Sequence, residues 1–433
     1  MTDDLPIVWD SVPLELVGMP STSNVDPSKF PNEIFELYSV PSYANNKPEI
    51  VTGAEIRSTK QSVEIGDVLL CKIAPHLNRV WIVRELHNYR RIASSEWIVI
   101  RSKIATSDYL RYALTEPKFR SAFMATSSGV GGSLIRARPR AVAKILIPLP
   151  PINEQRRIVE KLDRIFDRLR RVRDELSHIK KLIDRYKQAV LTAACSSENY
   201  ENGEIVDIQS VAHVGTGSTP LKSNSSYYAD IGIPWIISAA TNQPFVTEAS
   251  EFVTEYAISE CRLKKYPIGT LLVAMYGEGK TRGQVTELAI EATINQACAA
   301  IIVNESLACK EYVKLALQAN YFEMRQLAEG GNQPNLNLSK IRNFLIFLPP
   351  LEEQKEIVRR IEERFGKIDK LEQEYQKAVK LCDRLEQETL AKAFRGELVP
   401  QDPNDEPASV LLERIRAERA MLTQPRKKSP LRK

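Results

Sequence analysis

The sequence predicts an α+β protein: two mixed α/β domains separated by two long helices that form an antiparallel coiled coil. Three observations carry this prediction. They are a heptad repeat between Asn153 and Thr192, a second heptad repeat about 199 residues later, and short strand-like segments before each repeat. The chain of 433 residues is long enough for two or three domains with cores of their own. The pattern indicates a tandem, pseudo-symmetric duplication of globe and rod.

The first long helix is predicted from apolar residues that recur in alternating steps of four and three. These residues are Ile158, Leu162, Ile165, Leu169, Val172, Leu176, Ile179, Ile183, Tyr186 and Val190. A stripe at every 3.5 residues forms a narrow seam that requires a partner helix. No glycine or proline interrupts the stripe, so we expect one continuous helix.

The second long helix begins with a copy of the motif that opens the first. Pro150-Pro151-Ile152-Asn153-Glu154-Gln155 returns as Pro349-Pro350-Leu351-Glu352-Glu353-Gln354. Its seam is less purely apolar and includes Ile357, Ile361, Ile368, Leu371 and Leu385. The first helix carries 12 Lys and Arg against 7 Asp and Glu, and the second carries 10 against 11. These opposite biases favour pairing of the two helices with each other.

The repeat divides the chain into five predicted segments. We expect a first α/β globe at 1–147, a first long helix at 148–192, a second globe at 193–347, a second long helix at 348–392 and a C-terminal segment with a basic tail at 393–433. The globes also match each other, because Tyr109-Leu110-Arg111-Tyr112-Ala113-Leu114 returns as Tyr312-Val313-Lys314-Leu315-Ala316-Leu317. The globes match weakly and the rods match well, so a constant frame carries two variable modules.

Composition excludes several classes of protein. Hydrophobic residues make up 43% and charged residues 27% of the chain, which is ordinary for a soluble protein. No apolar run approaches 18 residues and the N-terminus lacks a signal-peptide core, so we expect a cytoplasmic protein without a membrane span. The six cysteines form no C-x-x-C pair, which indicates reduced thiols and no metal site. A net charge of +5 permits nucleic-acid binding without requiring it.

No catalytic motif emerges from the chain. Gly277-Glu278-Gly279-Lys280-Thr281 resembles the end of a phosphate-binding loop, but position 274 is Ala where that motif requires Gly. A plain Gly-rich loop between strands is the simplest interpretation. The alternatives are contact of Lys280, Thr281 and Arg282 with a nucleic-acid backbone, or an enzyme built around Lys280. The four histidines lack the spacing of a metal site.

A basic ladder follows a Gly-rich loop near the end of the first globe. Arg136, Arg138 and Arg140 stand at alternate positions, which share one face if the segment is extended. The matching segment of the second globe, Gly330 to Asn337, carries Asn and Gln instead of Arg. Arginine suits guanine edges or phosphate, and Asn and Gln suit adenine edges. A solvated charged face is the alternative for the arginines.

With these motifs, the chain resembles the specificity subunits of type I restriction–modification systems. The resemblance rests on the twin segments Leu149-Pro150-Pro151-Ile152-Asn153-Glu154-Gln155 and Leu348-Pro349-Pro350-Leu351-Glu352-Glu353-Gln354, the long helices behind them, and Ala393-Phe394-Arg395-Gly396-Glu397-Leu398. The second globe adds Gly215-x-Gly217-Ser218-Thr219-Pro220 and Trp235, a start that the first globe lacks. The first globe is therefore similar to a second type of recognition domain in the same family.

The resemblance implies a DNA-specificity subunit without catalytic residues. Each globe would be a target recognition domain for one half of a bipartite, gapped site in double-stranded DNA, and the coiled coil would set the gap and dock two methyltransferase subunits. Restriction and translocase subunits would join them, and S-adenosylmethionine, ATP and Mg²⁺ would bind to partner subunits, with no cofactor or metal in this chain. The candidate DNA-binding residues are Lys72, Asn78, Arg79, Arg136, Arg138, Arg140, Ser218, Thr219, Tyr276, Lys280, Thr281, Arg282, Asn332, Gln333 and Asn335. The candidate coiled-coil and docking residues are Ile158, Leu162, Ile165, Leu169, Val172, Leu176, Ile179, Ile183, Ile357, Ile361, Ile368, Leu371 and Leu385.

The competing hypothesis is a scaffold that does not bind DNA, with two α/β interaction modules on a coiled coil. Most long heptad helices are structural, so this hypothesis would be preferred without the twin signatures. A scaffold predicts no DNA affinity at any salt concentration. A recognition subunit predicts sequence-preferring binding, and the logarithm of its affinity should fall linearly with the logarithm of the salt concentration.

Overall fold

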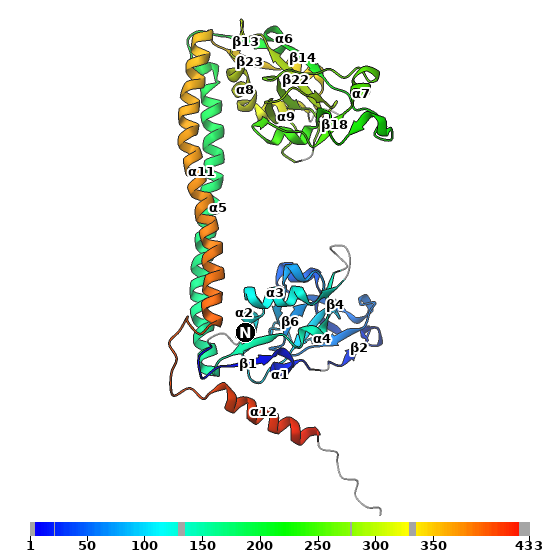
Figure 1. Cartoon of the computed structure of the whole chain (residues 1–433), viewed down its shortest axis with the longest axis vertical. Helices are drawn as coiled ribbons and strands as arrows, with labels where there is room; N and C mark the ends of the chain where they lie inside the picture. Colours follow the sequence, from blue (N-terminus) through cyan, green and yellow to red (C-terminus); the bar gives the residue numbers. More distant parts are fainter. Residues whose placement is uncertain (1–4, 21, 129–134, 278, 329–334, 424–433) are drawn as a thin grey trace, which may run out of the picture. The chain divides into compact units, whose positions relative to one another are not determined.

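The computed structural model describes residues 5–20, 22–128, 135–277, 279–328 and 335–423, with the side chains of the last helix described as far as residue 417. The chain forms two compact units (Figure 1). Unit 1 consists of Met1–Glu175 and Ala378–Lys433, and unit 2 consists of Leu176–Lys377. Each unit therefore contains one α/β globe and one half of each long helix.

The globe of unit 1 is built on a five-stranded sheet with the order β2-β5-β8-β3-β4 and a three-stranded sheet with the order β7-β6-β9. Its strands are β1 (Asp10–Pro13), β2 (Asn24–Val25), β3 (Ile34–Tyr38), β4 (Glu49–Thr52), β5 (Lys60–Ser62), β6 (Val68–Cys71), β7 (Val80–Ile82), β8 (Arg90–Ala93), β9 (Trp97–Ile100), β10 (Ser127–Ser128), β11 (Arg136–Ala137) and β12 (Leu146–Leu149). Its helices are α1 (Leu14–Gly18), α2 (Ser107–Ala113), α3 (Pro117–Ala125) and α4 (Pro139–Val142). The short strands expected before the first heptad repeat are confirmed, and they include β6, β7 and β9.

The globe of unit 2 is built on a five-stranded sheet with the order β14-β22-β19-β20-β17 and a four-stranded sheet with the order β15-β18-β16-β21. Its strands are β13 (Glu204–Asp207), β14 (Ala212–Thr216), β15 (Tyr228–Ala229), β16 (Ile233–Ile236), β17 (Phe245–Val246), β18 (Glu251–Val253), β19 (Leu271–Ala274), β20 (Val285–Leu288), β21 (Thr293–Ile294), β22 (Cys298–Val303) and β23 (Leu345–Leu348). Its helices are α6 (Ile208–Val211), α7 (Glu255–Glu260), α8 (Lys310–Ala319), α9 (Tyr321–Ala328) and α10 (Leu338–Arg342).

The rod consists of α5 (Ile152–Ala194) and α11 (Leu351–Phe394). Two prolines precede each helix, and a proline ring fixes φ in the range that starts a helix. In unit 2, Lys180 bonds to Glu372 and Lys187 bonds to Asp369, so rising residue numbers in α5 meet falling numbers in α11. The predicted antiparallel pair of long helices is thus confirmed.

The seam between the helices follows the prediction at its ends. Eight predicted seam residues are buried: Ile158, Leu162, Leu169, Ile183, Val190, Ile357, Ile361 and Ile368. Ile165 and Leu176 are half-buried. Five others were wrongly placed on the seam, because Val172, Ile179, Tyr186, Leu371 and Leu385 are 46%, 45%, 54%, 60% and 44% exposed.

Charged residues one position further along α5 take the place of the exposed apolar ones. Lys180 Nζ lies 2.5 Å from Glu372 of α11, and Lys187 Nζ lies 2.8 Å from the same carboxylate. In unit 1, Arg173 lies 2.9 Å from Asp383 and 2.6 Å from Glu386. Because these long side chains reach the facing helix, ion pairs alternate with apolar layers along the seam. Val172 and Ile179 therefore turn to the flank of the rod.

Each rod helix joins its globe through the same contacts in both units. The Gln155 carboxamide accepts from Thr106 N at 2.9 Å and donates to Ile104 O at 3.0 Å, and Gln354 accepts from Cys309 N at 2.7 Å. Thr106 and Cys309 are the N-cap residues of α2 and α8. The hydroxyl of Tyr109 donates to Pro148 O and that of Tyr312 to Phe347 O, both at 2.8 Å.

A two-stranded sheet lies beside each of these junctions. β1 pairs with β12, with Asp10 opposite Leu149, and β13 pairs with β23, with Glu204 opposite Leu348. The predicted domain boundaries at 147/148 and 347/348 fall within β12 and β23. The core of the first globe includes Ile158 of the rod, and the core of the second includes Ile357. Globe and rod are therefore packed as one body within each unit.

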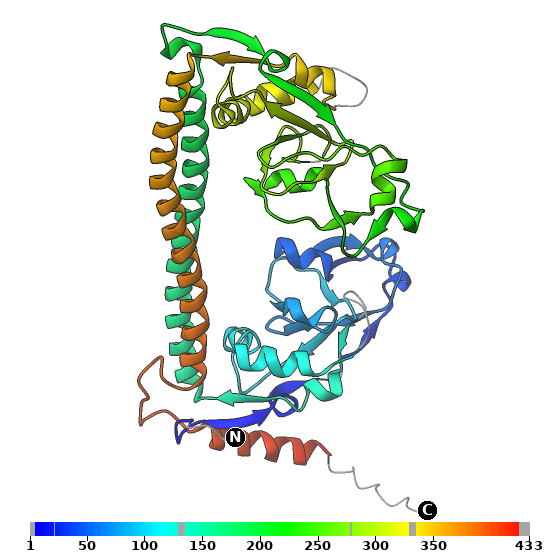
Figure 2. The ribbon, with the colours of Figure 1, turned by 45° about the horizontal axis from the view of Figure 1, so that its top comes forward.

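The last helix, α12 (Ala408–Thr423), packs in unit 1 near the first residues of the chain (Figure 2). Ala408 N donates to Val8 O at 3.2 Å, and Leu412 belongs to the same core as Trp9. Asp405, just before α12, lies 2.6 Å from Arg157 of α5. Among the described residues, no helix combines the length and apolar character that crossing a bilayer requires.

Candidate functional site

In the first globe, two segments that the sequence singles out lie side by side. Lys72 follows β6, and its carbonyl accepts from Ala137 N at 2.8 Å. Ile73 forms an antiparallel bridge with Arg136, and Ala74 N donates to Ile135 O at 3.0 Å. The loop after β6 is therefore joined by backbone hydrogen bonds to the segment that carries the arginines.

The basic ladder is not continuous, which corrects the predicted extended face. Arg136 lies in β11, but α4 begins at Pro139, because proline at the first helical position presets the turn. Arg138 is the N-cap of α4 and donates from Nε to Thr126 O at 3.0 Å, whereas Arg140 lies within α4. Arg136 lies 3.3 Å from Glu96, and its side chain is 44% exposed. The three arginines therefore lie in different local structures, a strand, an N-cap and a helix, and do not share one extended face.

Asn78 and Arg79 end the connection between β6 and β7, directly after the short 3-10 helix at Pro75–Leu77. The side chain of Asn78 is 8% exposed and donates to Leu114 O at 3.0 Å, so this residue holds the connection to the end of α2. Its left-handed φ of 42° suits asparagine. Arg79 lies 3.9 Å from Cys71 Sγ, and burial raises the pKa of that thiol. Asn78 was predicted to contact DNA, but its burial assigns it to the fold.

In the second globe, the Gly-rich loop connects β19 to β20, and no helix follows it directly. The resemblance to a nucleotide-binding phosphate loop is therefore misleading, because that motif places a helix directly after its lysine, whereas contact of Lys280 with a nucleic-acid backbone stays a prediction. Tyr276 is 38% exposed, and the side chain of Lys280 is exposed. Thr281 Oγ1 donates to the side-chain oxygen Oδ1 of Asn242 at 3.5 Å, and Arg282 donates to Gly277 O at 3.4 Å.

Helix α9 holds this loop through residues that sequence reasoning missed. Tyr321 donates to Lys280 O at 2.8 Å. Arg325 donates to Gly279 O at 2.8 Å and to Arg282 O at 3.1 Å. Gly283 has φ +82°, and a side chain there would crowd Arg325. The available signal was the spacing of Tyr321 and Arg325, which places both on one face of α9.

The second globe repeats the pairing of its two candidate segments. Leu336 N donates to Met275 O at 3.1 Å, which places half-buried Asn335 beside the strand end that carries Tyr276. Asn332 and Gln333 lie outside the described residues. Ser218 and Thr219 are half-buried after β14, and Ser218 O accepts from Trp235 Nε1 at 3.2 Å. In both globes, the loop after a central strand therefore meets the segment that follows the Gly-Gly pair.

The rod carries a second candidate surface. Its exposed apolar residues are Val172, Leu381 and Leu385 in unit 1, and Ile179, Leu182, Tyr186 and Leu371 in unit 2. A cleft lies between rod and globe in each unit. Arg170 of the rod lines the cleft of unit 1, and Asp184 lines that of unit 2. Residues two positions apart on a helix point in nearly opposite directions. The exposed apolar face of each unit therefore lies on the side of the rod away from the globe.

The ion pairs of the rod have distinct electrostatics. Hydrogen bonds from Lys180 and Lys187 lower the pKa of Glu372 to about 2. Its side chain is 29% exposed, so the pair is partly shielded from solvent.

Within the described part of the chain, no cluster of His, Cys, Asp or Glu has the arrangement of a metal site.

A family model and individual known proteins both show that this chain is similar to one family. Residues 200–381 match the family model described as the type I restriction modification DNA specificity domain. The chain is similar to the type I restriction enzyme EcoKI specificity subunit of Escherichia coli, with 26% identity over 345 residues, 73% of each chain. It is also 27% identical over 164 residues, 36% of each chain, to the MjaIX specificity subunit of Methanocaldococcus jannaschii.

Solved structures show the same fold. One, from work on complex assembly and conformational transition of the type I R-M system, covers 91% of this chain and 99% of its own, with a TM-score of 0.77 and 24% identity. The HsdS subunit of Thermoanaerobacter tengcongensis covers 91% and 98%, with a TM-score of 0.54 and 24% identity. At this identity, these similarities establish the fold alone.

Proposed function

We propose that this chain, which is similar to type I restriction–modification specificity subunits, confers DNA sequence specificity and that each globe recognises one half of a bipartite, gapped site. The first globe would contact one half-site and the second globe the other. The rod would fix the number of base pairs between them. The scaffold hypothesis is not favoured, because the relatives are specificity subunits.

One observation carries the proposal: both globes bring the same two segments together. The loop after β6 meets β11 in the first globe, and the loop after β19 meets Leu336 in the second. The segments themselves differ, with Arg136 and Arg138 in one globe and Asn335 and Lys280 in the other. Equivalent positions with different hydrogen-bonding groups suit two readers of different base sequences.

The side chains of these segments divide into two expected roles. Arg136 and Lys280 are exposed cations, which suit phosphate contacts or the acceptors of guanine. Asn335 presents an amide, which suits an adenine edge. Phosphate contacts would fix the register of the globe on the duplex, and base contacts would supply the sequence preference.

Catalysis would belong to partner subunits. We propose that two methyltransferase subunits dock on the exposed apolar faces of the rod and bind S-adenosylmethionine, and that restriction and translocase subunits use ATP and Mg²⁺. An exposed face with several large apolar residues is typical of a protein–protein contact. Replacing Ile179 by Asp should abolish co-purification of the methyltransferase subunit, whereas replacing exposed Glu374 by Lys should not.

The first test is co-expression with the methyltransferase subunit, followed by single-molecule sequencing of methylated DNA. A split, asymmetric motif with a fixed gap would establish the proposed function. Binding to that motif should weaken linearly, in log affinity against log salt concentration. A stable complex that neither methylates nor binds DNA would contradict the proposal.

A further inference from the structure

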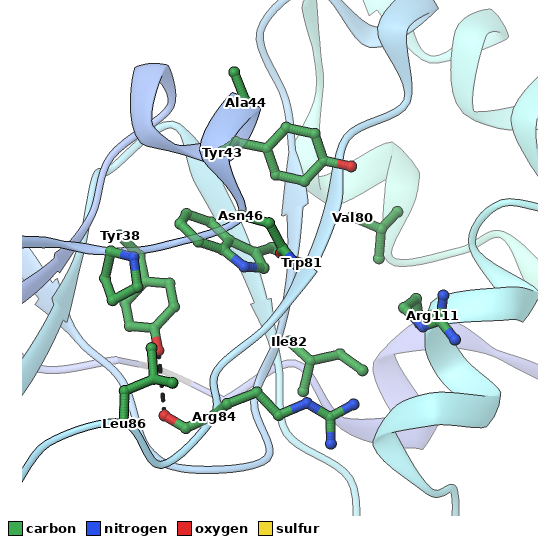
Figure 3. A pocket seen from close by; sticks show the side chains of 11 residues that line it. Tyr38, Tyr43, Ala44, Asn46, Val80, Trp81, Ile82, Arg84, Leu86 and Arg111 are labelled. Atoms are coloured by element: carbon green, nitrogen blue, oxygen red, sulfur yellow. Dashed lines mark hydrogen bonds between the residues drawn. The ribbon is translucent and has the colours of Figure 1, made fainter. Parts of the chain in front are cut away.

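A cavity of about 580 Å³ opens in the first globe (Figure 3). Its size falls within the range of about 300–1,000 Å³ that is usual for small-ligand sites. The side chains that matter are Tyr38, Tyr43, Asn46, Trp81, Arg84 and Arg111. They come from the end of β3, the short 3-10 helix at Pro41–Asn45, β7 and α2, so several elements converge on one space.

Trp81 distinguishes this cavity from ordinary core packing. The chain has four tryptophans, and three of them donate from the indole nitrogen: Trp9 to Glu154, Trp97 to Tyr38 O and Trp235 to Ser218 O. Trp81 is 5% exposed and lines the cavity, yet its indole N–H has no acceptor among the described residues. Because this N–H is not buried within the protein, it is open to the cavity and available to a ligand.

The aromatic wall of the cavity is rigid. The rings of Tyr38 and Trp97 lie 4.7 Å and 6.1 Å from the ring of Trp81, and Tyr43 lies at 5.8 Å. Tyr43 is half-buried, and its hydroxyl has no acceptor within the described part of the chain. Asn46 closes the turn after Tyr43 with a left-handed φ of 50°, and its side chain is exposed. The cavity therefore offers flat apolar surface together with unpaired donors.

Two arginines stand at the rim. Arg84 lies 2.6 Å from Asp108, and its side chain is 58% exposed. Arg111 lies 3.4 Å from Asp163, and its guanidinium lies 4.1 Å from the ring centroid of Tyr112. Each guanidinium has five N–H donors, so one carboxylate can hold it in place while other donors remain for an anion. Figure 3 shows both guanidinium groups beside Ile82 and Val80 of the cavity wall.

We propose that this cavity binds a single nucleotide, with the base against Tyr43 and Trp81 and the phosphate at Arg84 and Arg111. The face of Tyr43 would stack on the base. The ring of Trp81 stands at 82° to that of Tyr43, so its in-plane N–H would donate to an acceptor on the base edge. The proposal rests on the proposed function, because it takes DNA as the source: a nucleotide unstacked from the first half-site. A free nucleoside monophosphate has the same chemistry, so the experiment separates the two sources.

The experiment uses the full chain in two arms. In the first arm, dAMP, dGMP, dCMP and TMP are titrated separately while tryptophan fluorescence is recorded. In the second arm, the chain binds a duplex that carries the methylated motif, with 2-aminopurine placed at each position of the first half-site in turn. An unstacked 2-aminopurine becomes more fluorescent, so one responding position would identify DNA as the source.

Two variants and a control test the geometry. Tyr43→Ala should weaken the response about 5-fold to 100-fold, which corresponds to the measured range for loss of one base–aromatic stack. Trp81→Phe keeps a ring but removes the donor, and it should weaken the 2-aminopurine response of the second arm several-fold, a readout that does not depend on the fluorescence of Trp81 itself. Tyr256→Ala removes a 54% exposed ring in the second globe and should change nothing. A melting temperature for each variant separates lost binding from lost folding.

The outcomes divide cleanly. A response of the duplex that is lost in both variants supports an unstacked nucleotide, and a response to free nucleotides alone supports the cavity with a free ligand. Silence in both arms, or responses that both variants leave intact, would overturn the inference. If the chain still binds its motif while both arms are silent, only this inference fails. If no duplex is preferred at all, the proposed function fails as well.

Discussion

The junctions between rod and globe use the same residue types and hydrogen bonds in both units, whereas the candidate DNA-contacting loops lie at equivalent positions but carry different residues. At the junctions, Gln155 and Gln354 bind the N-caps of α2 and α8, and Tyr109 and Tyr312 bind the last strand of each globe. In the loops, Asn78 is buried at the end of the β6–β7 connection, while Lys280 is exposed on the β19–β20 loop held by α9.

This difference follows from burial. Gln155 and Gln354 are 0% and 1% exposed, so a change there leaves a buried donor or acceptor without a partner. The side chain of Lys280 ends in solvent, and its backbone is fixed by Tyr321 and Arg325, so its own identity is free to vary. A constant frame with interchangeable contact residues is what two readers of different sequences require.

The largest effect should come from breaking the frame itself. Leu169 is buried in the seam, and a proline there costs about 3 kcal/mol or more because it removes a helical hydrogen bond and clashes with the preceding turn. We expect Leu169→Pro to abolish assembly with the methyltransferase subunit and recognition of both half-sites. Leu169→Met should preserve both activities. Loss of one half-site alone would show that the globes do not share the rod.

A smaller effect should follow from each junction separately. Gln155→Ala and Gln354→Ala leave buried groups unpaired, at about 1–3 kcal/mol for each group. Chemical unfolding of the two variants should give similar losses if the junctions are equivalent. A loss more than twofold larger for one variant would break the symmetry. Asn153→Ala, whose exposed amide lies 3.3 Å from Arg156, is the control and should change stability little.

Sequence patterns predicted the frame well because its signals are periodic and repeated. The heptad steps and the twin Pro-Pro-x-x-Glu-Gln motif located α5 and α11. The same periodicity failed at Val172 and Ile179, since a stripe cannot show that Lys180 and Lys187 reach across to Glu372. Asn78 was wrongly assigned to DNA contact, and Arg138 was wrongly placed on an extended face, for a similar reason. Their surroundings depend on Leu114 and Pro139, which residue type alone does not reveal.

The contact residues of the two globes should be separable. Arg136→Ala with Arg138→Ala should weaken recognition of one half-site, and Lys280→Ala should weaken the other. A lost base contact costs about 1–3 kcal/mol of discrimination, whereas a lost phosphate contact lowers the salt slope by about one. Methylation of libraries randomised in one half-site at a time distinguishes these results. Equal loss at both half-sites would contradict the model of two independent readers.

The smallest effect concerns the polar layers of the rod. Glu372 has a pKa of about 2 in the folded chain, against an ordinary value of 4.5. Because the folded pKa is lowered, its contribution is complete above pH 4.5 and is lost as pH falls towards 2. Solvent reaches the pair, so we expect Glu372→Gln to cost about 1 kcal/mol at pH 6.

The pH dependence of stability distinguishes this cross-helix pair from exposed charges that pair only within one helix. The difference between Glu372→Gln and the unaltered chain should shrink as unfolding is measured from pH 4.5 down towards pH 2. Glu374 pairs with Lys377 on its own helix, and both side chains are 70% exposed, so Glu374→Gln should change little at any pH. If both variants behaved alike, the alternation of ion pairs and apolar layers would not stabilise the rod. If only Glu372→Gln responds, the charged positions that displace Val172 and Ile179 from the seam are part of what holds α5 to α11.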